Sequence, residues 1–306
     1  MSELEIIRHQ QIGGISIFFD TVEYRTPHFH PEWELIWITS GSLAVLSRQQ
    51  ESLAQPGDLF LFCPKQLHEF RQTDSGATFL CLQISPQVFD CSFPELRTIA
   101  LEDSRVGLYL NREESEQLRA MMRELMGEYL ERKDYHALRC TSLCARILAL
   151  LLSRLPSHPM TEEELSSADK RTARLSRFLD FVDENYMHKL RLADFAKREG
   201  CTVSYMSRFL KQNMNQSFQD YLDTVRFHSA CRMIRAGGMK MLDICEEAGF
   251  SDYRYFSKCF KEHCGMTPVA YSRSKLPGDE HPGRRSPNTV EHFYSREESL
   301  EMLRKL

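Results

Sequence analysis

Residues 248–273 read AGFSDYRYFSKCFKEHCGMTPVAYSR, and this stretch decides the fold of the C-terminal part of the chain. Its apolar side chains recur at helical spacing after a turn, so the stretch predicts an amphipathic helix. The outward positions of that helix carry Tyr253, Arg254, Ser257 and Lys258. An acid on this face would repel phosphates, whereas Arg, Lys, Ser and Tyr can donate to phosphates or bases. The face is therefore suited to contact with a polyanion.

An upstream stretch repeats the arrangement. Residues 192–213 read LADFAKREGCTVSYMSRFLKQN, and residues 241–263 read MLDICEEAGFSDYRYFSKCFKEH. Each begins with a short helix, stops at a glycine and continues from a polar N-cap, Thr202 or Ser251. Asp252 is also expected to cap or position the second of these helices, because a carboxylate favours the helix N-terminus. Helix, tight turn and helix form a helix-turn-helix unit, whose second helix enters the DNA major groove. The outward residues of the first unit are Ser204, Ser207, Arg208 and Lys211.

One continuous helix is predicted between the two units. Residues 217–238 read SFQDYLDTVRFHSACRMIRAGG, with apolar side chains on a single packed face. A rigid connector would fix the two reading helices relative to each other. They would then enter successive major-groove segments about 34 Å apart on one side of the duplex.

Residues 174–274 resemble the DNA-binding domain of the AraC/XylS family of bacterial transcription regulators. The resemblance rests on SYMSRFLK, SFQDYLDTVR, AGFSDYRYFSKCFKEHCGMTP and AYSR. It implies base-reading roles for Ser204, Ser207, Arg208, Tyr253, Arg254 and Lys258. It also implies a transcription activator that recruits RNA polymerase, binds promoter DNA and responds to a small molecule such as a sugar.

The N-terminal part has a different pattern. From about residue 12 to 90, short runs rich in β-branched and aromatic residues alternate with turn residues, which predicts a small barrel or sandwich. Within it, PHFHPEWELIWITSG and PGDLFLFCPKQLHEF resemble the two motifs of the cupin barrel. The expected fold class is therefore α+β with two domains: a cupin-like barrel with covering or dimerising helices, and an all-α domain with two helix-turn-helix motifs.

The cupin motifs point to a candidate ligand site at His28, His30, Glu34 and His68. In a metal cupin these would be the four metal ligands, and they suit Mn, Fe, Ni or Zn. In a metal-free sensor the same side chains would bond the hydroxyl groups of a small molecule. A third reading makes them structural. We expect metal-free ligand contact and no cofactor, with Trp37 stacking on a sugar ring or packing in the core.

The predicted domain order follows from these patterns. Residues 1–111 form the sensing barrel, and residues 112–154 form two helices with apolar stripes wide enough to seat a partner subunit. Residues 155–170, LPSHPMTEEELSSADK, read as a linker, and residues 171–275 form the DNA-binding domain. The tail, 276–306, contains a possible capping box at Ser295 and Glu298, which predicts a short helix.

Composition limits the cellular setting. Residues 1–170 hold 16 Lys and Arg against 25 Asp and Glu, whereas residues 171–275 hold 18 against 12, so only the second region is basic. No apolar run approaches the ~18 residues of a membrane span, and no signal peptide is visible, so a cytoplasmic location without membrane contact is expected.

The ten cysteines form no CxxC pair and are expected to be reduced thiols, with a redox switch at Cys140 as the alternative. The rival function is a metal-dependent cupin enzyme with an added DNA-binding module; we expect no enzyme.

Overall fold

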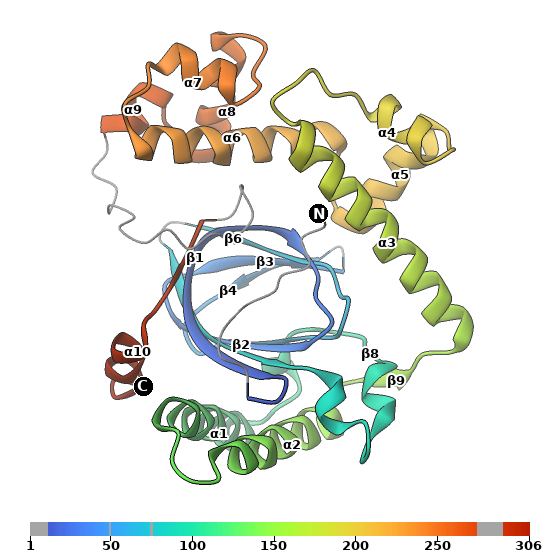
Figure 1. Cartoon of the computed structure of the whole chain (residues 1–306), viewed down its shortest axis with the longest axis vertical. Helices are drawn as coiled ribbons and strands as arrows, with labels where there is room; N and C mark the ends of the chain where they lie inside the picture. The colour runs from blue at the N-terminus through green and yellow to red at the C-terminus, as the bar shows by residue number, and fades with distance from the viewer. Residues whose placement is uncertain (1–11, 49, 74–75, 274–289) are drawn as a thin grey trace. The chain divides into compact units, whose positions relative to one another are not determined.

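The computed structural model describes residues 12–48, 50–73, 76–273 and 290–306 (Figure 1). They form two compact units. We call residues 12–172 together with 291–306 the barrel unit, and residues 173–273 the helical unit. Helix α3, Glu162–Asn185, begins in the first unit and ends in the second.

The barrel unit is built on one curled antiparallel sheet (Figure 1). Its strand order is β4-β3-β6-β1-β7-β2-β5, and β10 pairs with β1 as an additional strand. Hydrophobic alternation and turn residues specify these strands, as the sequence predicted. Their bounds are β1 Ile15–His28, β2 Trp33–Ser40, β3 Leu43–Ser47, β4 Gln50–Ala54, β5 Leu59–Phe62, β6 His68–Gln72, β7 Ala77–Ile84 and β10 Val290–Phe293.

The two faces of the sheet have separate cores because strand side chains alternate in direction. The inner face carries Ile36, Phe62, Phe70 and Phe79, all of them buried. The outer face carries Trp33, Leu35 and Trp37, which pack against helices α1, Arg112–Glu131, and α2, His136–Arg154. The inner face is therefore the lining of the barrel, and the outer face is the bed for the helices.

A glycine is required where β2 turns into β3. Gly41 has φ of +73°, and a Cβ there would lie 2.2 Å from the carbonyl oxygen of Gly76. Both the left-handed backbone and this close approach exclude other residues. The glycine of the first cupin-like motif thus has a steric role.

The segment 155–170 is more ordered than a linker. Strand β9, Ser157–Pro159, pairs with β8, Ile99–Leu101, and α3 begins at Glu162. Thr161 and Glu164 bond each other's backbone N–H groups, at 3.3 and 2.7 Å, which is a capping box. Three glutamates in the first turn also stabilise the helix, because their negative charges lie at the positive end of the helix dipole. Residues 161–164, TEEE, therefore begin a helix inside the predicted linker.

Three short 3-10 helices lie between β7 and α1 in the barrel unit: Pro86–Phe89, Pro94–Arg97 and Val106–Leu108.

The apolar stripes predicted on α1 and α2 are buried within the barrel unit itself. Leu125 is fully buried and Leu148 nearly so, in the core that joins the two helices to the sheet. What α2 leaves outward is a different set at heptad spacing: Leu138, Ser142, Ala145 and Ala149 are exposed, whereas Leu152 is half-buried and also packs against the outer core. Among the described helices, α2 alone is long and apolar enough to cross a membrane, a test that core helices also pass.

The helical unit contains both predicted helix-turn-helix units on a central helix. Helix α6, Phe218–Ala236, is the continuous connector that the sequence predicted. The first unit consists of α4, Leu192–Arg198, and α5, Val203–Met214; the second consists of α7, Met241–Glu247, and α8, Tyr253–Cys264, followed by α9, Pro268–Arg273.

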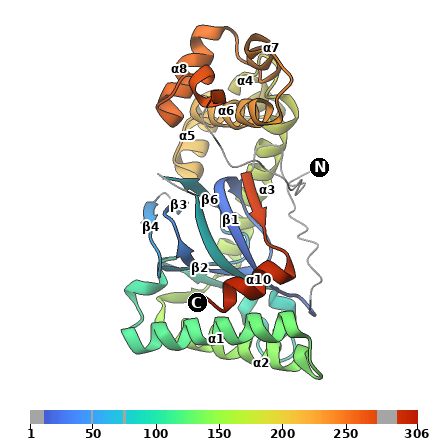
Figure 2. The same cartoon turned by 90° about the vertical axis from the view of Figure 1, so that its left-hand side faces the viewer.

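The C-terminal segment returns to the barrel unit, which the sequence did not predict. β10 lies along β1, and helix α10, Arg296–Leu303, packs on α1 (Figures 1 and 2). The predicted capping box is present, with Ser295 and Glu298 bonding each other's backbone N–H groups.

Candidate functional site

The turn of the second helix-turn-helix unit allows only glycine. Gly249 has φ of +84°, and a Cβ there would lie 2.4 Å from the carbonyl oxygen of Tyr186, at the end of α3. Arg226 donates from Nε to the same oxygen at 2.9 Å. The turn, the end of α3 and α6 are therefore locked together, which sets the direction in which α8 leaves the turn.

The N-caps of α5 and α8 are both among the residues that the sequence offered for this role. Thr202 caps α5, since its hydroxyl accepts from the backbone N–H of Tyr205. The cap of α8 is Asp252 and not Ser251: the carboxylate accepts from the N–H of Tyr255 at 2.8 Å, and the Ser251 hydroxyl donates to that carboxylate. The Tyr255 N–H holds the pKa of Asp252 below its usual value. Asp is the stronger cap because its charge also favours the helix N-terminus.

The predicted DNA-contacting side chains lie on the outward faces of α5 and α8. Thr202, Ser204, Ser207, Arg208 and Lys211 are exposed at the first unit. At the second, Ser251, Tyr253, Arg254 and Lys258 are exposed and Ser257 is half-buried. Tyr253, Arg254, Ser257 and Lys258 line one surface depression together with Lys261. The first acid on this helix, Glu262, lies a turn further along and is 3.5 Å from Nζ of Lys258.

Two contacts that the sequence did not predict hold α5 and α8 in place. The hydroxyl of Tyr255 donates to the carboxylate of Asp223 on α6. Arg174 on α3 donates to the hydroxyl of Tyr205 at 2.7 Å and also bonds Glu199, at the end of α4. Tyr205 and Tyr255 occupy the same position in the two repeats, three residues after Thr202 and Asp252, so the repeat itself was a signal for them.

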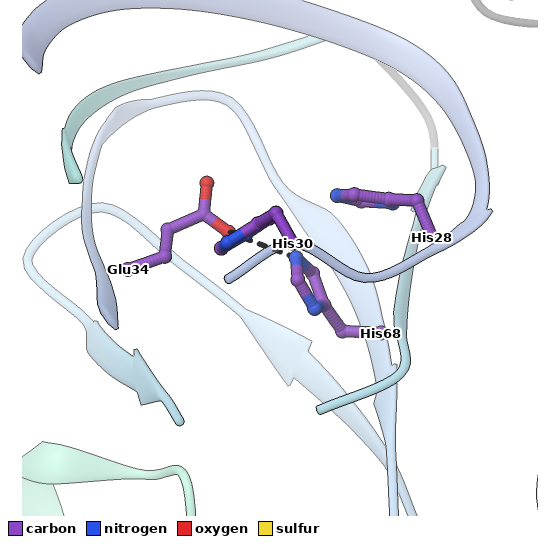
Figure 3. Close-up of side chains that lie close together, drawn as sticks. All are labelled: His28, His30, Glu34 and His68. Atoms are coloured by element: carbon purple, nitrogen blue, oxygen red, sulfur yellow. Dashed lines mark hydrogen bonds and ion pairs between the residues drawn. The ribbon is translucent and has the colours of Figure 1, made fainter. Parts of the chain in front are cut away.

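The four predicted ligand residues of the barrel come together on its inner face (Figure 3). His28 ends β1, Glu34 lies on β2, His68 begins β6, and His30 lies between the first two strands. Nε2 of His30 is 2.9 Å and Nε2 of His68 is 2.8 Å from the same carboxylate oxygen, Oε2 of Glu34. All four side chains are buried, with residue exposures between 1% and 4%.

The orientation of two of the imidazoles is set by the backbone. Nδ1 of His28 lies 2.8 Å from the carbonyl of Thr26, and Nδ1 of His68 lies 2.9 Å from that of Gln66. A carbonyl only accepts, so each Nδ1 carries a proton and each Nε2 is directed into the cluster. Nε2 of His68 thereby lies 2.8 Å from Oε2 of Glu34.

Burial dominates the electrostatics of the cluster. It lowers the pKa of His68, and with the nearby Arg25 it lowers the pKa of His28 well below its usual value. Burial alone would raise the pKa of Glu34, but its histidine neighbours hold that pKa well below the usual range. The cluster thus combines an ionised carboxylate with two imidazoles, those of His28 and His68, whose pKa values are lowered by burial.

Two further residues orient the carboxylate, and nothing in the sequence marked them. Sγ of Cys81 and Nε2 of Gln83, both on β7, donate to Oε1 of Glu34 at 3.0 and 3.4 Å. This leaves Oε2 directed at the histidines. The four candidate ligand atoms lie within 4.8 Å of one another, and ligands on opposite sides of an ion with bonds of ~2.1 Å are about 4.2 Å apart. Small side-chain movements would close the set around one ion, so the residues fit a metal.

Trp37 is not part of this cluster. It lies an odd number of positions from Glu34 on the same strand, so the two side chains point to opposite faces. Trp37 packs in the outer core under α1, with the Arg123 guanidinium 5.7 Å from its ring centroid. The prediction that Trp37 contacts a ligand in the barrel was wrong, and the core-packing alternative describes it.

The cysteines are free thiols, and Cys140 is poorly suited to a redox switch. It is fully buried in the outer core, and burial raises the pKa of its thiol to about 11. Since the thiolate is the reactive form, this thiol is protected from oxidation.

Comparisons with known proteins agree with both halves of this description. A family model described as an AraC-like ligand binding domain matches residues 14–148, and one described as a helix-turn-helix domain matches residues 195–274. The uncharacterized HTH-type transcriptional regulator YbfI of Bacillus subtilis is 26% identical over 226 residues, 74% of this chain and 78% of that protein. The chain belongs to the AraC family of HTH-type transcriptional regulators, with a ligand-binding domain followed by a DNA-binding domain.

Other relatives match a smaller part of the chain. The HTH-type transcriptional activator RhaR of Mannheimia succiniciproducens is 23% identical, over 58% of this chain and 63% of that protein. The lactose operon transcription activator of Staphylococcus xylosus is 28% identical, over 30% of this chain and 33% of that protein. A crystal structure of ToxT from Vibrio cholerae is similar over 84% of this chain and 94% of that one, with 16% identity and a TM-score of 0.38. The chain thus spans less than two thirds of RhaR and of the lactose operon activator.

Proposed function

We propose that the chain is an effector-controlled transcription activator whose helices α5 and α8 enter successive segments of the major groove of promoter DNA. One observation supports this most strongly: the exposed N-terminal halves of both helices carry no acid, while their opposite faces are buried. The proposed contacts are those of Thr202, Ser204, Ser207, Arg208, Lys211, Ser251, Tyr253, Arg254, Ser257 and Lys258.

The connector between the reading helices has a suitable length. Helix α6 has 19 residues and so spans about 28 Å, close to the ~34 Å between successive major-groove segments. Within the proposal, residues 1–111 sense the effector, 112–154 dimerise, 155–170 connect and 171–275 bind DNA.

Dimerisation is proposed through the outward face of α2, the seam of Leu138, Ser142, Ala145, Ala149 and Leu152. Leu138 is 71% exposed, and small residues at the centre of the seam would let two helices approach closely. The stripes of α1 and α2 that face the barrel are not available to a partner. Subunit contact is thus expected at a face that the fold leaves open.

The effector is proposed to act in the barrel, where a sugar or sugar derivative is the class suggested by the relative named as a lactose operon activator. The activator role is suggested by that relative and by RhaR, and contact with RNA polymerase and a cytoplasmic location go with it. The matched relatives named above as regulators favour a protein without enzymatic activity.

A metal ion is a second proposed ligand of the barrel, favoured by the convergence of His28, His30, Glu34 and His68. Imidazole and carboxylate donors suit Zn, Fe, Ni or Mn, and such an ion would hold together three strands of the sheet. Mass spectrometry of protein purified without an affinity tag should find about one equivalent, which His68→Ala protein should lack. If adding each ion leaves the melting temperature of the metal-free protein unchanged, the proposal of a metal ligand is refuted.

The regulator itself is tested by mapping the genomic sites that the full-length protein occupies. A recovered site should bind purified protein with an affinity that falls steeply with salt, because phosphate contacts release counterions. The proposed function would be overturned if the DNA affinity did not change with salt concentration, or if the mapping found no enriched genomic sites. The rival cupin enzyme is tested with the same protein. If the protein activates transcription from a recovered promoter and turns over no small molecule, it is a regulator and not an enzyme.

A further inference from the structure

The four-residue cluster of His28, His30, Glu34 and His68 is supported from outside as a metal site would be (Figure 3). In protein metal sites, an imidazole that binds the ion through one ring nitrogen usually places the other beside a carboxylate or a backbone carbonyl. All three imidazoles follow this rule. Nδ1 of His28 and Nδ1 of His68 lie on backbone carbonyls, and Nδ1 of His30 lies 3.5 Å from Oε2 of Glu32. The support of the histidines therefore favours an ion at the centre of the cluster.

The surroundings of the cluster leave little room for a larger ligand. The ring of Phe62 stacks on that of His68, with 4.2 Å between centroids, and the ring of Phe70 lies 5.3 Å from it. Phe62, Phe70 and Phe79 are each 1% exposed or less, so water barely reaches them from outside or from a cavity. An organic effector would have to displace these side chains, whereas an ion needs only the donor atoms that already converge.

The loop between β5 and β6, residues 63–67, is bonded to two of the four candidate ligands. The backbone N–H of Lys65 donates to the carbonyl of His30 at 2.7 Å. The carbonyl of Gln66 accepts from Nδ1 of His68 at 2.9 Å. An ion that draws the donor atoms of the cluster together therefore pulls on this loop at two points.

The β5–β6 loop is held in one shape by the side chain of Gln66. Its Nε2 donates to the hydroxyls of Ser47 and Ser104, at 2.8 and 2.7 Å. Its Oε1 accepts from the backbone N–H of Cys63 at 3.1 Å. Lys65 has φ of +61°, a left-handed conformation that is uncommon for a residue with a Cβ. Because these bonds fix the loop, a pull at one end is not absorbed by bending.

The same loop is linked to α3, the helix that continues into the helical unit. Nζ of Lys65 lies 2.7 Å from Oδ1 of Asp169 on α3. Sγ of Cys63 accepts from the backbone N–H of Leu101 at 3.2 Å, and Leu101 pairs with Ser157 of β9, shortly before α3 begins. The loop therefore contacts α3 directly and is also connected to its start through the β8–β9 pair.

We propose that a divalent transition-metal ion in the four-residue cluster is the signal to which the regulator responds, and that the β5–β6 loop passes its presence to α3. The proposal rests on the proposed effector control by the barrel, and of the two ligands considered there it makes the ion the effector. Imidazole donors favour transition ions over Mg and Ca, which prefer oxygen ligands. Since aromatic side chains close the site, a substrate has no room on the ion, which is a signal and not a reagent.

Helix α3 leads from the loop to the second helix-turn-helix unit. It runs as one helix to Asn185, and the next carbonyl, that of Tyr186, meets the turn at Gly249 and accepts from Nε of Arg226. That turn sets the direction of α8. A displacement of α3 by the loop therefore reaches a DNA-reading helix without any contact between the ion and DNA.

The first test measures promoter binding with and without the ion. Full-length protein purified without a tag is stripped with a chelator, and its Kd for a recovered promoter is measured alone and with Zn, Ni, Mn or Mg salts. We expect a transition ion to change this Kd at least about fivefold and Mg to leave it unchanged. Glu34→Gln should lose the response, and His136→Gln, at the start of α2 and outside the cluster, should keep it.

The outcomes separate the ion from the regulator. Equal promoter Kd values with and without an ion that binds in one equivalent would overturn the ion as the signal. Protein that binds none of the transition ions would refute the ion as ligand and as signal together. If neither the metal-free nor the ion-treated protein binds any recovered site, the proposed regulator itself fails.

The second test breaks the contact between the loop and α3 without changing the cluster. Lys65→Asp places two like charges together at Asp169, and Asp also tolerates a left-handed backbone. An exposed pair contributes a factor of up to about five to an equilibrium constant, so the variant should lose most of a fivefold response while its ion affinity by calorimetry stays unchanged.

A charge exchange provides the decisive control. The double variant Lys65→Asp with Asp169→Lys restores opposite charges and should restore the response. Arg97→Asp is the matched single variant, because Arg97 forms an exposed ion pair with Asp90 elsewhere in the barrel unit, and it should respond as the wild type does. A full response in Lys65→Asp, or no recovery in the double variant, would overturn the route through the loop.

Discussion

Replacing Arg254 by alanine should remove sequence discrimination while leaving general DNA affinity nearly intact. Arg254 is the second residue of α8, exposed, and directed away from the buried face formed by Phe256 and Phe260. Residues in the first turn of such a helix reach base edges. The planar guanidinium can meet O6 and N7 of one guanine together, which is the commonest specific contact in the major groove.

The expected magnitude follows from the contact that is lost. A bidentate pair to guanine contributes about 1–3 kcal/mol of discrimination, which corresponds to a factor of roughly 5 to 150 in affinity at the cognate site. Arg254 is a surface residue of the free protein, so its removal should change the melting temperature little. The ratio of specific to non-specific affinity should therefore fall by nearly the whole factor.

Lys211 provides the matched control. It lies in the last turn of α5, where a phosphate is the expected partner. Lys211→Ala should weaken binding to all duplexes alike and reduce the salt slope by about one. Competition binding of the wild type and both variants to cognate and scrambled duplexes at one salt concentration measures both effects. If Arg254→Ala weakens both duplexes equally, α8 does not read bases as described.

Three further outcomes test the scaffold around the interface. Leu138→Glu in the outward face of α2 should convert the full-length dimer to a monomer in sedimentation without changing its melting temperature, and a persistent dimer would place the subunit contact elsewhere. Gly249→Ala should abolish DNA binding and lower thermal stability, because the new Cβ would overlap the carbonyl of Tyr186; wild-type stability would show that the turn can relax. Tyr255→Phe removes the hydrogen bond to Asp223 and should cost about 1–3 kcal/mol in denaturant unfolding, whereas a loss below 0.5 kcal/mol would mean that water replaces it.

The helical unit could be predicted nearly in full because its signals are local. Helical spacing, N-caps and glycine stops act within a few residues, so the two repeats and the helix between them follow from short stretches of chain. The choice between Ser251 and Asp252 as the cap of α8 is of the same local kind. Ser251 and Asp252 are both good caps, and adjacent candidates are separated only by backbone geometry.

The barrel shows the opposite case. Motif spacing placed His28, His30, Glu34 and His68 in one site, but it could not say whether the donor atoms converge. Their convergence depends on the pairing of β1 with β6 and on Cys81 and Gln83, which hold the carboxylate from β7. The assignment of Trp37 to the ligand site was wrong, since the period of two along a strand directs its side chain to the face opposite that of Glu34.

The sequence by itself therefore determined the two folds, their order, the reading helices and the residues on their outward faces, since periodicity and capping are properties of neighbouring residues. Only the tertiary structure decided which apolar stripe of α1 and α2 is buried, how Tyr255 is held by Asp223, and that the last residues of the chain return to the barrel. Contacts such as Arg25 with Glu291 join residues that are far apart in the chain. No local pattern encodes them, because the free energy that selects them comes from burying both partners together in the finished fold.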